Sequence, residues 1–252
     1  MSRWTVLWTP PRTESPMTTP ATRTASPATS WSRGARAAGA LTLALAGLLW
    51  LLADLVEPSL EGVASQTWIA ENPGPAGVAL TADMLATPFL AGATALWLLL
   101  ARARSPRLAW TGAVLLVFGL TGQAVITGVG LTAYMVAQSG KVDAAAFSAA
   151  IGDGPDASLP GTVFTMMFFA GAFIGIVVMM VAVWRSRALP RAAVLLLVAF
   201  QAADIVSLPF PTTVIAAAGL LWMAVSLLRA RGVRAGRPAE DMGGGVHAVE
   251  RS

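Results

Sequence analysis

The sequence predicts an all-α membrane protein, a bundle of six transmembrane helices with both termini in the cytoplasm. Three observations predict this fold class. Hydrophobic residues make up 56% of the chain and charged residues 12%, about half the charged share of a soluble domain. Six apolar segments alternate with polar connections. All Lys and Arg residues except Lys141 fall near the two chain ends or in two of these connections, which is the distribution that marks the cytoplasmic side of membrane proteins.

The two chain ends differ in composition from the rest. Residues 1–33 are rich in Ser, Thr, Pro and Arg, and residues 231–252 are rich in Gly and Arg. Such segments bury too little apolar surface to fold, so we predict two disordered cytoplasmic tails around a transmembrane domain of residues 34–230. The preference for Arg over Lys, with abundant Ala and Gly, indicates GC-rich codons, and we expect a bacterial plasma membrane.

The first predicted span covers residues 36–56. Its roughly 20 residues match a hydrocarbon core of ~30 Å at ~1.5 Å per residue. Asp54 and Glu57 lie three residues apart, on one helical face where the helix leaves the bilayer. We predict an outer loop at residues 61–76, because the Asn-Pro-Gly-Pro sequence at 72–75 is a turn signal.

The second predicted span, residues 77–101, carries a polar stripe of Asp83, Thr87 and Thr94. A carboxylate inside a membrane costs about 2.5 kcal/mol or more when it faces lipid, so Asp83 should face protein, water or an ion. Counting at ~1.5 Å per residue places it in the outer half of the bilayer. Pro88 predicts a kink one turn further on, because proline cannot donate the helical hydrogen bond.

The third and fourth spans are predicted at residues 108–138 and 162–184. In the third, Gln123 and Thr127 form a second polar stripe, and Gln123 lies at the depth expected for a partner of Asp83. The fourth contains a Gly-x-x-x-Gly pair, which allows close helix packing within the chain, in self-association or with another membrane protein. The glycines of this pair are Gly171 and Gly175.

The loop between these spans contains an acidic turn at residues 152–156, which lacks the pattern of a calcium loop. The fifth span is predicted at residues 191–208 and the sixth at 212–228. The fifth carries Gln201 and Asp204, and Asp204 again falls in the outer half of the bilayer.

The polar residues inside the spans form one candidate site for a ligand, a proton or a cation. Its members are Asp83, Gln123, Thr127, Gln201 and Asp204, with Asp54 at the outer rim. Apart from Arg36 and Arg191 at the first positions of their spans, no Lys, Arg or His lies within the spans to neutralise the aspartates. If two of them share one low-dielectric cavity, a proton or cation should be shared between them. The alternative is that each aspartate is separately hydrogen-bonded and only fixes helix packing.

Three functions remain open on this evidence. The first is a small proton- or cation-linked carrier or sensor, and the second is an intramembrane enzyme that uses an aspartate as general acid on a lipidic or isoprenoid substrate. The third is a structural or accessory membrane subunit. The chain has no Cys, and its one His, His247, lies in the predicted tail, so we predict no metal site and no cofactor. The basic residues follow the topology rule, which argues against nucleic-acid binding.

The Arg36-Ala-Ala-Gly39 opening of the first span, the six-span size and the unequal outer loops resemble an uncharacterised family of six-span integral membrane proteins of high-GC bacteria. The resemblance covers residues 36–230. It implies the architecture alone, because that family carries no assigned activity and no functional residues transfer from it.

Overall fold

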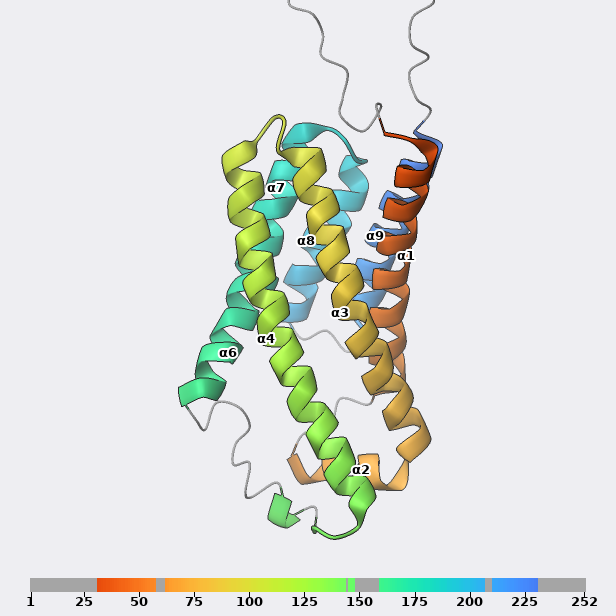
Figure 1. The fold of residues 1–252 in the computed structure, drawn as a ribbon, viewed down its shortest axis with the longest axis vertical. Helices are drawn as coiled ribbons and strands as arrows, with labels where there is room; N and C mark the ends of the chain where they lie inside the picture. Colours follow the sequence, from red (N-terminus) through yellow and green to blue (C-terminus); the bar gives the residue numbers. More distant parts are fainter. Residues whose placement is uncertain (1–30, 58–61, 144, 148–158, 207–209, 231–252) are drawn as a thin grey trace, which may run out of the picture.

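The computed structural model describes residues 31–57, 62–143, 145–147, 159–206 and 210–230, and within these ranges every regular element is a helix (Figure 1). The prediction of an all-helical protein is therefore confirmed for the described part of the chain. The predicted tails, apart from residues 31–33, and the acidic turn at 152–156 lie outside it.

The helices run in order along the chain. They are α1 (Arg33–Val56), α2 (Gly62–Glu71), α3 (Pro73–Ala101), α4 (Pro106–Ser139), α6 (Leu159–Phe169), the π-helical segment η3 (Ala170–Gly175), α7 (Ile176–Ser186), α8 (Arg191–Ile205) and α9 (Thr213–Arg229). Four of the described helical segments are long and apolar enough to cross a membrane: α1, α3, α4 and the continuous run of α6, η3 and α7. The chain is thus built like a membrane protein.

Local chemistry explains where several helices begin and end. The Ser32 side chain accepts a hydrogen bond from the Ala35 amide and caps α1. Pro73 and Pro106 begin α3 and α4, where the missing amide hydrogen costs nothing. Gly140, with φ of 60°, ends α4 in the left-handed conformation that glycine adopts without strain.

The prediction that residues 61–76 form a loop with a turn at 72–75 is wrong, because most of them are helical. Most of this range is the helix α2, and the Asn-Pro-Gly-Pro sequence begins α3 instead of forming a turn. The signal is ambiguous because proline favours the first turn of a helix as well as a β-turn. Figure 1 shows α2 running across one end of the bundle, where Gln138 of α4 donates a hydrogen bond to the Ile69 carbonyl at 3.2 Å.

The α8–α9 pair is much shorter than the helices around it. These helices have 15 and 17 residues, or about 22 and 25 Å, whereas α4 has 34 residues and spans about 51 Å. In Figure 1, α8 and α9 stop well before the end of the bundle at which α2 lies. Asp204, near the end of α8, therefore sits beside helices that continue past it.

Tight packing of small residues joins α4 to the α6–η3–α7 segment. Gly171 and Gly175 are buried against α4, and a Cβ atom on Gly171 would overlap the backbone of Gly119. The predicted glycine pair is thus used inside the chain, and self-association through it would require α4 to move away. The buried Met179 and Met180 add to the core beside it.

Candidate functional site

The strongest polar cluster lies between α3 and α4 and is centred on Asp83. Gln123 donates to both carboxylate oxygens of Asp83, with Nε2–Oδ1 and Nε2–Oδ2 distances of 3.3 and 3.1 Å. The Thr127 hydroxyl donates to Oδ2 at 2.6 Å. Gln123 and Thr127 are one helical turn apart, so both side chains reach the same partner. The structure therefore brings together these three residues of the predicted site.

The other two aspartates of the predicted site have separate hydroxyl partners. The hydroxyl of Thr213 on α9 donates a short hydrogen bond to Asp54 on α1. Thr212 donates to Asp204 across the α8–α9 turn at 3.2 Å. Each of the three aspartates thus accepts a hydrogen bond from a neutral threonine hydroxyl.

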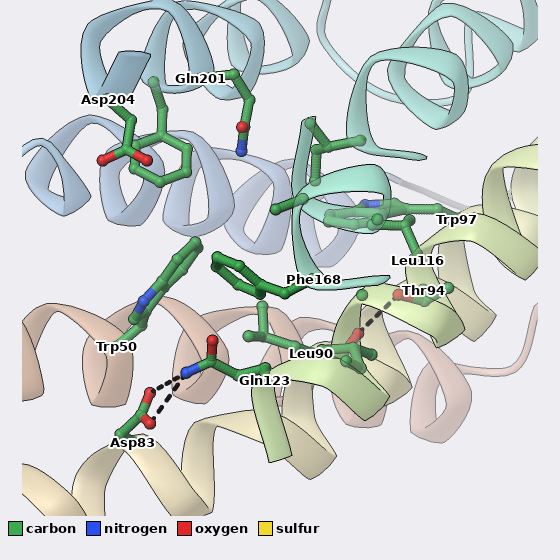
Figure 2. A pocket seen from close by; sticks show the side chains of 16 residues that line it. Trp50, Asp83, Leu90, Thr94, Trp97, Leu116, Gln123, Phe168, Gln201 and Asp204 are labelled. Atoms are coloured by element: carbon green, nitrogen blue, oxygen red, sulfur yellow. Dashed lines mark hydrogen bonds between the residues drawn. The ribbon is translucent and has the colours of Figure 1, made fainter. Parts of the chain in front are cut away.

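An inner cavity of about 100 Å³ lies among the helices beside Asp83 and Asp204 (Figure 2). Asp83, Gln123, Gln201 and Asp204 all line it, and Asp54 does not. Most of the remaining lining is apolar and includes four aromatic side chains, Trp50, Trp97, Phe168 and Phe200. Asp83 and Asp204 therefore line one cavity, although each also has its own hydrogen-bond partners, as the alternative interpretation expected.

The two carboxylates nevertheless do not form a dyad. In Figure 2, the Trp50 and Phe168 side chains lie between Asp83 and Asp204. Trp50 packs edge-to-face on Phe200, with ring centroids 5.1 Å apart. The aromatic side chains thus separate two carboxylates that line one cavity, and each aspartate keeps its own threonine partner.

A second space adjoins the first; we call it the outer vestibule because it is wider and more open than the inner cavity. It has a volume of about 410 Å³ and is lined by Asp54, Glu57, Asp83, Thr127 and other residues of α1, α3 and α4. Trp50, Asp83 and Gln123 line both spaces. Asp83 consequently stands where the acidic outer vestibule meets the mostly apolar inner cavity.

Glu57, just beyond the end of α1, belongs to the vestibule although the sequence did not single it out as a site residue. Much of its side chain is exposed. Even so, desolvation by surrounding protein atoms raises the pKa of Glu57 above its ordinary value of 4.5, and the negative charges of Asp83 and Asp54 raise it further. The vestibule is therefore a region of negative potential.

The aromatic lining was also missed, and helical spacing carries the signal that finds it. Trp50, Asp54 and Glu57 lie at i, i+4 and i+7, on one face of α1. Trp97 lies 14 residues after Asp83, which is close to four helical turns and returns to the same face of α3. Extending each polar stripe along its own helix would have found both tryptophans.

Two polar groups facing the inner cavity are buried without a partner. Gln201 is 5% exposed, and its Oε1 atom accepts no hydrogen bond in the described part of the structure. The Trp97 side chain is 2% exposed, and its Nε1 atom donates no hydrogen bond to any described residue. Buried polar atoms are nearly always hydrogen-bonded, so each such exception calls for an explanation.

Across the described ranges, no group of three or more His, Cys, Asp or Glu side chains is placed to hold a metal ion. No protein-family model, curated protein or solved structure matches the chain. The chemistry of the cavity and vestibule therefore provides the evidence about function.

Proposed function

We propose that this chain is a six-span membrane protein of a bacterial plasma membrane, with both termini in the cytoplasm. We further propose that it is a small carrier or sensor that binds a proton or a monovalent cation at Asp83. In this proposal the outer vestibule is the entrance and the inner cavity lies behind the binding group. The observation that carries it is the position of Asp83 at the junction of the two spaces.

The distribution of charge supports the proposed orientation. Figure 1 places the beginning of α1, the α3–α4 turn, the α7–α8 turn and the end of α9 at one end of the bundle. The basic residues of these segments are Arg33, Arg36, Arg102, Arg104, Arg107, Arg185, Arg187, Arg191 and Arg229. The vestibule acids Asp54 and Glu57 lie toward the opposite end. Positive charge at one end favours the cytoplasm for that end.

The partners of Asp83 support an ion-binding role. Gln123 and Thr127 supply only neutral donors, which hydrogen-bond a carboxylate without cancelling its charge. The neighbouring acids Asp54 and Glu57 add negative potential in the same vestibule. A proton or small cation arriving there would lower the electrostatic energy of the cluster.

The flux of protons or alkali cations into liposomes tests the carrier role. Purified protein is reconstituted with an internal pH-sensitive dye, and internal pH is followed after an external acid pulse, with sodium or potassium gradients in parallel. We expect Asp83→Asn to lower the rate at least about tenfold, because the neutral amide offers neither a negative charge for a cation nor a carboxylate for a proton. Asp143→Asn, at an exposed position outside the helices described above, should leave it unchanged. Equal rates for wild type and Asp83→Asn would contradict the proposal.

A second candidate function is an intramembrane enzyme acting on a lipidic or isoprenoid substrate. The aromatic lining of the inner cavity favours it, because such walls suit an apolar substrate and Asp83 or Asp204 could act as the general acid. It predicts a new lipid product by mass spectrometry when the protein is incubated with extracted bacterial lipids. Absence of any product that depends on Asp83 or Asp204 would remove this candidate.

A further inference from the structure

We propose that the inner cavity binds a compact quaternary ammonium group, such as the head of choline. This inference rests on the proposed function, because it names the substrate class of the cavity behind Asp83. Its evidence is the combination of aromatic walls, carboxylates without a basic partner, and two buried polar atoms without a hydrogen-bond partner, all lining the same space.

The aromatic walls match a cation that carries methyl groups. The Trp50 and Phe200 rings meet at 78° and form two nearly perpendicular walls. Phe168 and Trp97 contribute further aromatic surface to the lining. Cations bind the faces of aromatic rings, tryptophan best of all, and quaternary ammonium groups are recognised by cages of such rings.

The charge of the cavity also favours a cation. Asp83 and Asp204 both line it, and their hydrogen-bond partners Gln123, Thr127 and Thr212 are neutral. Among the residues that the structure describes, no Lys, Arg or His contributes to the lining. A cation bound between the rings would supply the opposite charge that the two carboxylates lack.

Hydrogen-bonding capacity distinguishes a quaternary from a primary ammonium. A primary ammonium brings three N–H donors that need acceptors, whereas most of the cavity lining is apolar. A quaternary ammonium has no N–H group to satisfy. Gln201 Oε1 and Trp97 Nε1 then offer one acceptor and one donor for a small polar group elsewhere on the ligand.

The size of the cavity limits the ligand to a compact head group. Its volume of about 100 Å³ is smaller than the ~150 Å³ engineered cavity that binds benzene in another protein. The cavity therefore excludes a multi-ring cation, and a ligand with a trimethylammonium head would also occupy part of the adjoining space. The adjoining outer vestibule, which shares Trp50, Asp83 and Gln123, gives such a ligand a route from outside.

Calorimetric titration of the full-length protein in nanodiscs tests the inference. The nanodiscs contain phosphatidylethanolamine and phosphatidylglycerol, and the probes are choline and its uncharged isostere 3,3-dimethylbutan-1-ol. We expect choline to bind at least about tenfold more tightly than the alcohol, because only choline gains from the rings and carboxylates. Equal affinity of the two probes, or no binding of choline, would overturn the inference.

Variants locate the binding site. We expect Trp50→Leu and Asp204→Asn each to weaken choline binding about tenfold, since they remove one aromatic wall and one charge. The matched controls are Trp222→Leu, at a tryptophan that is 48% exposed on α9, and Glu71→Gln, on the exposed side of α2. Equal losses in the variants and their controls would also overturn the inference.

A second nanodisc preparation identifies the source of the ammonium group. Weaker apparent choline affinity in nanodiscs that contain phosphatidylcholine would support a lipid headgroup as the natural ligand. Unchanged affinity would support a free quaternary ammonium compound. The liposome flux assay reports separately on the carrier function. Choline binding without ion flux would contradict the carrier function and support the quaternary ammonium site. Ion flux without choline binding would support the carrier function and overturn the quaternary ammonium site.

Discussion

Asp83 has both carboxylate oxygens hydrogen-bonded to side chains of one neighbouring helix. This contact was predictable from sequence, because Asp83 and Gln123 fall at matching depths on consecutive antiparallel spans and Thr127 is one turn from Gln123. The Asp54–Thr213 contact was not predictable in the same way. It depends on α1 packing beside α9. The predicted depth of a residue in the membrane does not reveal which helices, distant in sequence, are neighbours.

Thr127→Val tests how much the shortest of these Asp83 contacts contributes. The substitution keeps the shape of the side chain and removes the hydroxyl that donates to Asp83 at 2.6 Å. We expect the free energy of unfolding to fall by about 1.5–3 kcal/mol, the range for hydrogen bonds to charged groups. Denaturant titration in detergent measures it. The control is Thr132→Val on the exposed side of α4, where the hydroxyl donates to the Gly128 carbonyl. It should lower the free energy of unfolding much less. Equal losses in the two variants would argue against a special role for Thr127.

Glu57→Gln tests the negative potential of the vestibule. The pKa of Glu57 is raised in the folded protein above its ordinary value of 4.5, so the folded state binds this proton more tightly than the unfolded state does. Its contribution to stability is therefore fully present below pH 4.5 and is lost as pH rises through the raised pKa. The wild type should lose thermal stability over this window, and Glu57→Gln should lose less. Identical pH profiles for the two proteins would contradict this explanation.

At the scale of elements, the long apolar helices could be located from sequence to within a few residues, because hydropathy and flanking charge determine them. The helix α2 was missed because it lacks a long apolar stretch, and its proline-containing boundary looks like a turn. The π-helical segment η3 was also missed. A π-turn has no strong sequence signature, and here it coincides with Gly171, where α4 approaches too closely for a side chain.

Gly119→Ala tests this close approach between α4 and η3. A Cβ atom on Gly119 would lie 2.7 Å from the Gly171 Cα atom, so the helices must separate. We expect the free energy of unfolding to fall by about 1–3 kcal/mol, as for other overpacking substitutions. Gly128→Ala on the same helix is the control, because its Cβ would meet nothing within 4 Å, and alanine there should be neutral or stabilising by up to ~1 kcal/mol. A smaller loss for Gly119→Ala than for Gly128→Ala would refute the packing argument.

At the scale of the whole molecule, the sequence predicted an all-helical membrane protein, and the described structure agrees with this coarse class. The number of spans depends on how the short helices α8 and α9 lie in the bilayer. At about 22 and 25 Å they fall short of a hydrocarbon core of ~30 Å. The predicted bounds, residues 191–208 and 212–228, already indicated two short segments, and α8 ends three residues before its predicted end.

Cysteine labelling in intact cells tests the topology, and the native chain has no cysteine to interfere. The variants are Arg104→Cys in the α3–α4 turn and Ser139→Cys at the other end of α4, both at exposed positions. A membrane-impermeant maleimide should label Ser139→Cys from outside, and Arg104→Cys only after the cells are broken. The opposite pattern would invert the orientation and move the vestibule to the cytoplasmic side.

Infrared difference spectroscopy most directly tests the central claim, that Asp83 is the group that binds a proton or a cation arriving through the outer vestibule. The protein in nanodiscs is cycled between acidic and neutral pH, and the carbonyl band of protonated carboxyl groups is compared between wild type and Asp83→Asn. We predict a band in the wild type that is missing in Asp83→Asn and that added sodium or potassium weakens if a cation competes for the same carboxylate. Identical difference spectra for the two proteins would show that Asp83 is not the proton-binding group, and would contradict the proposed site.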